Sequence, residues 1–335
     1  MKTSIKFKTL CAIAILAFFG VTSCSKDEDP IVAPVTPAPT LLTIAAKASG
    51  TADLSILVAA LSKTNLVATL EGTGPFTVFA PTNAAFGALN YTAASITATT
   101  DPIQIAALKE ILLNHVISGK TAAAQLTDNS YLKTLGKGAA SSMNTLNMFV
   151  KKTTAAAGTV VKLNNNATVT TADIAASNGV IHVVDKVITA PTIVDLVAVN
   201  SNFSTLVGAL ATNGLVPTLE LAGPYTVFAP DNAAFAALFA EIGTPTSVQT
   251  TNVLKYHVVT GNVLAAGIPA LITANTAVGT LLNTQAFTFS STTAGIFITT
   301  NKVPVRPASK VVTTDIQGNN GVVHVIDKVL VPATF

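Results

Sequence analysis

The sequence predicts an α+β fold in which one domain occurs twice in tandem. Two long motifs are each present in two copies, in the same order, and all four histidines fall inside the copies at matching positions: GPFTVFAPTNAAF (74–86) with GPYTVFAPDNAAF (223–235), and NGVIHVVDKVI (178–188) with NGVVHVIDKVL (320–330). The copies are about 140 residues apart, a length typical of an independent domain rather than of a solenoid repeat. We therefore expect two domains, 40–190 and 191–335, each able to fold alone.

The apolar residues at the start of each copy predict a helix with one buried face. They recur at the i, i+3, i+4, i+7 spacing, as Leu54, Leu57, Val58 and Leu61 and again as Phe203, Leu206, Val207 and Leu210. A strand is expected next, because residues 76–79 and 225–228 are aromatic or β-branched and precede a proline. Thr82 and Asp231 then stand where a further helix begins, and both can accept a hydrogen bond from its first-turn amides. Two different residues in one position favour a structural role.

A later helix in each copy should carry a histidine on its apolar face. Leu108, Ile111, Leu112 and His115 have helical spacing, and Thr250, Val253, Leu254 and His257 repeat it. The rest of each copy reads as short strands, including a hairpin of residues 287–289 with 296–298. Asn178-Gly179 and Asn320-Gly321 predict tight turns before the last strand.

These two motif blocks resemble the signature blocks of the fasciclin (FAS1) domain. The resemblance covers about 40 to 190 and 191 to 335, the whole chain after its N-terminal region. It implies two FAS1-like domains, each a β-sandwich or wedge with helices packed on it, and a role in adhesion or matrix contact at cell surfaces. The adhesive Tyr-His pair proposed for the family matches Tyr256 and His257. The first copy departs from it with Asn114 before His115, so a shared adhesive site in both copies is in doubt.

The first 23 residues read as a secretory signal that ends in a lipid attachment site. Three lysines precede an apolar run from Leu10 to Val21, which is shorter than the roughly 20 residues of a membrane span. Val21-Thr22-Ser23-Cys24 looks like a bacterial lipobox, which implies cleavage before Cys24 and lipidation of that cysteine. The alternative is ordinary secretion with a chance cysteine.

Residues 24–39 read as a proline-rich tether, with four prolines between positions 30 and 39. A lysine and acidic residues directly after Cys24 resemble the export signal of some surface-displayed Gram-negative lipoproteins. The other interpretation is a solvated spacer. We expect an outer-membrane lipoprotein that is exposed at the cell surface, with a periplasm-facing position as the alternative.

Charge and composition argue against several function classes. Three of the 19 basic residues lie in the signal, which leaves 16 against 16 acidic residues, so nucleic-acid binding loses its electrostatic support. Charged residues make up 10% of the chain against a typical value of about 25%. The surface should be neutral and hydroxyl-rich, and no disulfide is expected once the signal with its Cys11 is removed.

The histidines do not form a recognisable catalytic or metal-binding pattern. His182 and Asp185 are three residues apart, as are His324 and Asp327, so on a strand the two members of each pair face opposite sides. No phosphate loop, nucleophile elbow or HExxH is present. We expect His115, His182, His257 and His324 to be structural, the protein not to be an enzyme, and no metal or cofactor to be bound.

The sequence thus favours a lipid-anchored adhesion or interaction module whose partner is an extracellular protein or polysaccharide. Its membrane contact would come through the N-terminal lipid. The first alternative is a carrier or scaffold that binds a small apolar ligand or a glycan between the two domains. A hydrolase is a weaker third. A deep pocket with convergent polar groups would favour the alternatives.

Overall fold

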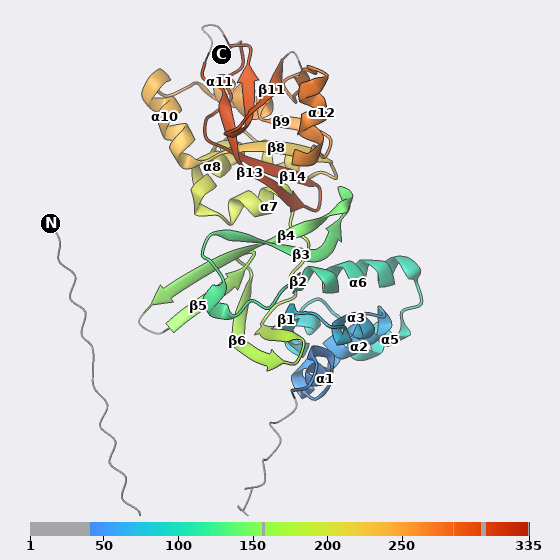
Figure 1. Ribbon diagram of the computed structural model, residues 1–335. Helices are drawn as coiled ribbons and strands as arrows, with labels where there is room; N and C mark the ends of the chain where they lie inside the picture. The colour runs from blue at the N-terminus through green and yellow to red at the C-terminus, as the bar shows by residue number, and fades with distance from the viewer. Residues whose placement is uncertain (1–40, 156–157, 284, 303–305, 334) are drawn as a thin grey trace, which may run out of the picture. The chain divides into compact units, whose positions relative to one another are not determined.

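The computed structural model describes residues 41–155, 158–283, 285–302, 306–333 and 335 (Figure 1). Residues 41–335 form one compact unit. The expected signal (1–23), its Cys24 and the expected tether (24–39) lie outside the described residues.

The two repeats share most of their elements in the same order. The first repeat contains α1 (Ile44–Ser49), α2 (Ser55–Lys63), α3 (Val67–Glu71), β1 (Phe76–Pro81), α4 (Asn83–Gly87), α5 (Ala93–Ala98), α6 (Pro102–Asn114), β2 (Val116–Ser118), β3 (Ser130–Gly138), β4 (Ser141–Ala155), β5 (Gly158–Leu163), β6 (Ala167–Ala176) and β7 (Gly179–Val184). The second contains α7 (Ile193–Ala198), α8 (Ser204–Thr212), α9 (Val216–Glu220), β8 (Tyr225–Pro230), α10 (Asn232–Ile242), α11 (Ser247–Tyr256), β9 (Val258–Thr260), α12 (Ile268–Thr273), β10 (Val278–Gly279), β11 (Ala286–Thr292), β12 (Gly295–Thr300), β13 (Ser309–Gly318) and β14 (Gly321–Ile326). Short 3-10 turns are η1 (Ala52–Leu54), η2 (Ala123–Gln125), η3 (Ser201–Phe203) and η4 (Ala265–Gly267). The repeats differ in that the first has α5 between β1 and β2, and the second has α12 between β9 and β10, where only short strands were predicted.

The strands confirm the α+β class but close differently in the two repeats. In the first, β1 to β7 form a closed barrel, in which β1 pairs parallel with β7 and antiparallel with β2. In the second, the seven strands form a sheet in the order β10-β11-β12-β13-β14-β8-β9. β3 is nine residues long and reaches β2 through the pair Ile117 and Thr134, whereas its counterpart β10 has two residues. The predicted hairpin of the second repeat is β11 with β12.

Each helix layer packs on one face of its strands and is held by local caps. Thr82 Oγ1 accepts the Ala85 amide at 3.2 Å to begin α4, and Asp231 Oδ1 accepts the Ala234 amide at 2.8 Å to begin α10. A capping hydrogen bond of this kind stabilises a helix by about 1 kcal/mol. The caps therefore fix where α4 and α10 begin, while burial supplies most of their stability.

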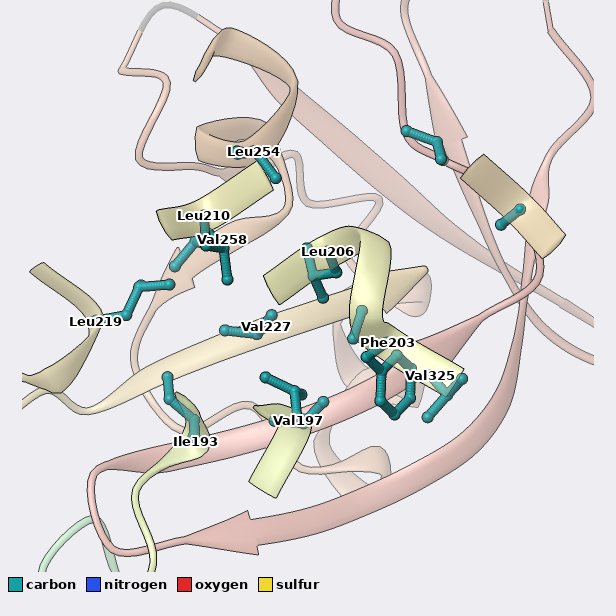
Figure 2. Packing of buried hydrophobic residues seen from close by; sticks show 14 of the residues in the cluster. Ile193, Val197, Phe203, Leu206, Leu210, Leu219, Val227, Leu254, Val258 and Val325 are labelled. Carbon is teal, nitrogen blue, oxygen red and sulfur yellow. The ribbon is translucent and has the colours of Figure 1, made fainter. Parts of the chain in front are cut away.

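The core of the second repeat shows how the predicted helix face is used. Phe203, Leu206 and Leu210 point from η3 and α8 toward Val227 of β8, with Val325 of β14 beside Phe203 (Figure 2). Truncating one of these leucines to alanine should cost about 2 to 5 kcal/mol, because the removed methyl groups leave a cavity. The first repeat builds the matching cluster from α2, β1 and β7 around Leu57 and Val78.

The two repeats touch through neutral polar groups. Tyr131 of β3 donates from its hydroxyl to the Leu196 carbonyl at 2.7 Å and packs against the second core. The buried Gln317 amide donates to Asn147 Oδ1 at 2.8 Å, and the Gln317 side chain accepts from Asn144 at 3.2 Å. Independent folding of 191–335 stays a prediction, and these contacts imply that separation would expose groups that are now paired.

Candidate functional site

His115 and His257 end their helices and are buried in matching hydrogen bonds. His115 caps α6, where Nδ1 donates to the Ile111 carbonyl at 2.7 Å and Nε2 accepts the Ile188 amide at 2.8 Å. His257 caps α11 and makes the same bonds to Val253 (2.7 Å) and Leu330 (2.9 Å). The amide that approaches Nε2 assigns the proton to Nδ1. Burial lowers the pKa of both rings from 6.5 to about 4, so they are neutral at physiological pH.

His182 and His324 lie inside the strands β7 and β14. Nδ1 accepts the amide of Asp173 at 3.1 Å in the first repeat and of Asp315 at 3.2 Å in the second. Nε2 then donates to the carbonyl of Thr121 at 2.9 Å or of Val263 at 2.8 Å. Burial lowers the pKa of His324. Each ring thus joins a strand bulge to the segment after β2 or β9, with both nitrogens occupied.

Each of these two rings also stacks on a phenylalanine of the central parallel strand. His182 lies 5.4 Å from the Phe79 ring and His324 lies 5.4 Å from the Phe228 ring. The parallel pairing of β1 with β7 and of β8 with β14 sets these two residues side by side. His182 and His324 are both fully buried, so neither imidazole is accessible from the surface in this structure.

Asp185 and Asp327, the acids that follow His182 and His324 in sequence, make their hydrogen bonds to the backbone of the preceding strand. Asp185 is exposed and accepts the Thr168 amide at 2.6 Å, and Asp327 accepts the Lys310 amide at 2.7 Å. Each carboxylate therefore ties the end of the last strand to the strand before it. Among the residues the structure describes, no three His, Cys, Asp or Glu side chains gather closely enough to hold a metal ion.

Tyr256, the candidate adhesion residue beside His257, is fully buried. Its hydroxyl donates to the Ala286 carbonyl at 2.8 Å and its ring meets Phe287 edge-on at 5.9 Å. Burial raises its pKa from 10.0 to about 12. Because His257 is also buried, contact with a partner through this pair would require the domain to open. An adhesive role for the pair stays a prediction without support from this geometry.

Asn114 replaces this tyrosine in the first repeat, where less space is left. Asn114 Nδ2 donates to the carbonyls of Ile188 (3.1 Å) and Thr189 (3.3 Å), while its Oδ1 is buried without a hydrogen-bond partner in the structure. β3 runs so close that a Cβ on Gly136 would lie 2.7 Å from the Asn114 backbone nitrogen. The second repeat has only the short β10 here, and the Tyr256 ring fills the interior between α11 and β11.

One asparagine in each repeat, Asn178 or Asn320, makes hydrogen bonds to segments that are distant in sequence, and the sequence did not lead us to expect this role. Asn178 accepts the Ile44 amide at 3.0 Å and donates to the carbonyls of Leu70 and Gly72. Asn320 does the same with Ile193, Leu219 and Leu221. We predicted these residues only as turn formers. Their identity in both copies, with an equally repeated glycine after them, was the available signal.

The glycine before each motif proline is fixed by the same asparagines. Gly74 has φ of 60° and Gly223 has φ of 64°, a region that favours glycine. A Cβ on either would collide with the carbonyl oxygen of Asn178 or Asn320. The repeated Gly-Pro therefore marks a close backbone approach rather than a ligand loop.

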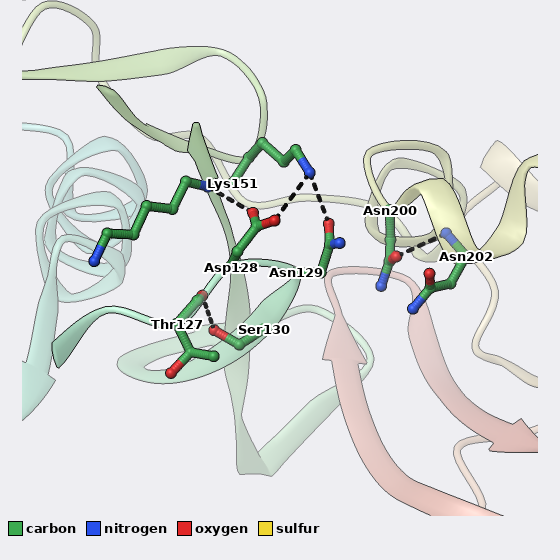
Figure 3. A network of polar contacts seen from close by, with 8 residues as sticks. Thr127, Asp128, Asn129, Ser130, Lys151, Asn200 and Asn202 are labelled. Atoms are coloured by element: carbon green, nitrogen blue, oxygen red, sulfur yellow. Dashed lines mark hydrogen bonds and ion pairs between the residues drawn. The ribbon is translucent and has the colours of Figure 1, made fainter. Parts of the chain in front are cut away.

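A small surface network pins the β3–β4 hairpin. Asp128 accepts the Lys152 amide at 2.7 Å and the Lys151 ammonium at 3.2 Å, and Lys151 also donates to Asn129 at 3.2 Å (Figure 3). The Lys152 amide, and then Lys151, hold the pKa of Asp128 below 3.8. The pair is solvent-exposed, so its contribution to stability is at most about 1 kcal/mol.

The groove between the repeats, which the carrier interpretation requires, is small. Its cavity volume is about 200 Å³, and it is lined by Leu163, Asn164, Asn166, Ala167, Ile188, Thr189, Pro191, Asp195 and Val199. Pockets for drug-sized ligands usually measure about 300 to 1,000 Å³. None of the helices in the described part of the chain has the length and hydrophobicity of a transmembrane span.

The fold and its repeated motifs agree with comparisons to known proteins. The model of the Fasciclin domain matches residues 52–190 and 201–332, so the chain belongs to the fasciclin domain family. Transforming growth factor-beta-induced protein ig-h3 of Sus scrofa is 30% identical over 302 residues, which are 88% of this chain and 38% of that protein. Protein sll1483 of Synechocystis is 40% identical over 150 residues, 43% of this chain and 74% of that protein.

A solved structure supports the tandem arrangement. The FAS1 domain pair of the insect cell adhesion molecule fasciclin I aligns with a TM-score of 0.50 at 17% identity, over 82% of this chain and 93% of that one. At this identity the likeness concerns the fold. The protein is therefore a tandem fasciclin-domain protein, as its repeated motifs predict.

Proposed function

We propose that this protein is a non-catalytic adhesion or interaction module of the cell envelope, anchored through a lipid on Cys24 and exposed at the outer surface. Its partner would be an extracellular protein or polysaccharide. The observation that supports this best is the burial of all four histidines, each with both ring nitrogens in hydrogen bonds to the backbone. The residues on which acid–base catalysis near neutral pH most often depends are thus used for structure.

Adhesion rather than another binding role is favoured by the fold relatives and by the duplication. The solved neighbour is itself described as a cell adhesion molecule. Two linked domains can engage a repeated partner together, which raises avidity without any new contact. The proline-rich segment ahead of residue 40 would hold both domains away from the membrane.

The carrier between the domains is the second candidate, and the size of the groove argues against it. A cavity of about 200 Å³ is below the usual range for an enclosed organic ligand. Extended partners such as proteins and polysaccharides need no deep pocket, because they bind over a wide surface.

The test is retention of defined partners by the chain from residue 25 onward, coupled to beads. Purified outer-surface polysaccharide and extracellular matrix proteins would be applied to the wild type and to two variants of one buried residue, Tyr256→Phe and Tyr256→Asn. We expect Tyr256→Phe to retain the partner and Tyr256→Asn to lose it in proportion to unfolding of the second repeat. Absence of retention for every partner, or turnover of a bound glycan, would contradict the proposal.

A further inference from the structure

The β4–β5 hairpin of the first repeat separates from β6 and leaves a groove. Only two residue pairs join β5 to β6, Lys162 with Thr168 and Leu163 with Ala167, and beyond them the hairpin extends away from β6 (Figure 1). The groove has a volume of about 420 Å³, which is within the usual range of about 300 to 1,000 Å³ for ligand sites. The residues that line it are all described in the structure: Ala123, Ala124, Lys152, Thr159, Val161, Val169, Thr170 and Ala172.

The groove combines an apolar floor with hydroxyl groups at its edge. Val161 is 4% exposed, and the half-buried Val169 packs against the same apolar cluster. Thr159 and Thr170 line the groove and are exposed. Such a surface suits a sugar ring, because a sugar presents C–H groups on the faces of its ring and hydroxyl groups around it.

Lys152 brings a positive charge to this groove without an acidic partner. Its Nζ donates to the carbonyls of Ala123 (3.3 Å), Ala124 (3.2 Å) and Leu126 (3.3 Å), and no carboxylate of the described residues lies within 4.0 Å of it. Asp173, on the strand beside the groove, accepts the Ala123 amide at 2.9 Å. Charged N–H donors usually bind at about 2.7 to 2.9 Å, so the ammonium can exchange one of its long bonds for a shorter one to a bound anion.

The second repeat has an apolar ring where Lys152 stands in the first. Lys152 and Phe289 each lie three residues before the end of their strand, β4 or β11, and the two hairpins have matching turns. Phe289 is 7% exposed and packs against the rings of Phe228 and Phe287. β11 and β12 carry no charged residue, whereas β4 and β5 carry three lysines and no acid: Lys151, Lys152 and Lys162. The positive charge is therefore a property of the first hairpin.

We propose that this groove binds a uronate residue of an acidic polysaccharide, with its carboxylate on Lys152 and its ring over Val161 and Val169. This site rests on the proposed function, because it names an acidic polysaccharide as the partner. A hydrogen bond between an ammonium and a carboxylate is stronger than one between neutral groups, so the acid should be preferred over its ester. Lys151 and Lys162 on the same hairpin attract the neighbouring uronates of the polymer.

The binding test is calorimetric titration of galacturonate and mannuronate oligomers of defined length into the chain from residue 25 onward. Their methyl esters are the neutral controls, and the free monosaccharides show whether one residue suffices. At least one acid should bind about tenfold more tightly than its ester, and its affinity should fall as the salt concentration rises. Absence of binding by both oligomers, or equal affinity for acids and esters, would overturn the proposal.

Two sets of variants locate the site. Lys152→Gln should remove the preference for acid over ester and Lys152→Arg should keep it, as should Lys109→Gln, which removes an exposed charge of α6 outside the groove. Ala172→Leu should fill the groove and weaken binding about tenfold, while Ala175→Leu, on the same strand but outside the groove, should not. The melting temperature of each variant verifies folding. Wild-type affinity in folded Ala172→Leu, or an unchanged preference in Lys152→Gln, would refute the assignment.

Retention on beads distinguishes failure of this site from failure of the adhesive role. The expected result is that the wild type retains a uronate oligomer and Lys152→Gln does not. Beads that retain a matrix protein or a neutral polysaccharide but neither uronate oligomer would refute this site and leave the adhesive role in place. Beads that retain none of these partners would refute both.

Discussion

Replacing Tyr256 tests whether the candidate adhesion residue is structural. Its ring is fully buried and its hydroxyl donates to the Ala286 carbonyl at 2.8 Å. Tyr256→Phe removes only that hydrogen bond and should cost about 1 kcal/mol, or somewhat more because the carbonyl loses its partner. Tyr256→Asn also removes the ring. An aromatic side chain buries about 150 to 250 Å², and at about 25 cal/mol per Å² the loss is about 4 to 6 kcal/mol, an upper value.

The second variant should therefore remove a large part of the stability of a domain, which is typically about 5 to 15 kcal/mol. The assay is urea denaturation followed by circular dichroism, with the midpoint compared among wild type, Tyr256→Phe and Tyr256→Asn. Asn114→Ala is the control in the first repeat, where no ring is lost. It should lower the free energy of unfolding less than Tyr256→Asn does, because the Asn114 Oδ1 already lacks a partner. If Tyr256→Asn keeps the wild-type midpoint yet loses its binding partner, the structural role of Tyr256 is wrong, and Tyr256 is an exposed contact residue.

Three further outcomes are expected. The pKa values of His115 and His257 fall from 6.5 to about 4 on folding, so the unfolded chain takes up protons at a higher pH than the folded chain. The free energy of unfolding should therefore be highest above pH 6.5 and decrease as the pH falls toward 4, by about 3 kcal/mol for each ring. Urea midpoints at a series of pH values would measure this decrease, and a flat profile would contradict it. Cys24→Ser should abolish fatty-acid labelling and release the chain from membranes; retention in the membrane pellet at high salt would exclude lipid anchoring as the cause. The fragment 191–335 should melt cooperatively but below the full chain, because it lacks the contacts of Tyr131; equal melting temperatures would show that those contacts add nothing.

The sequence by itself was sufficient for the duplication, the α+β class and the order of the elements around the two motifs, but it missed α12 (Ile268–Thr273), which lies where only short strands were predicted. Local signals predicted these features. Apolar spacing predicted α2 and α8, which contain Leu61 and Leu210, and β-branched and aromatic runs predicted β1 and β8. Thr82 and Asp231 marked the starts of α4 and α10. Each depends on interactions within a few residues along the chain, which is why a linear pattern can reveal them.

Only the tertiary structure decided where side chains distant in sequence meet. The bond from His115 to the Ile188 amide and the fastening of Ile44 by Asn178 join residues far apart in the chain, and no local pattern encodes such a pairing. The same holds for Tyr256: its motif resembles an adhesive pair, yet a short β10 leaves interior space that its ring fills. Packing around a residue, rather than its identity, determines whether it is available to a partner.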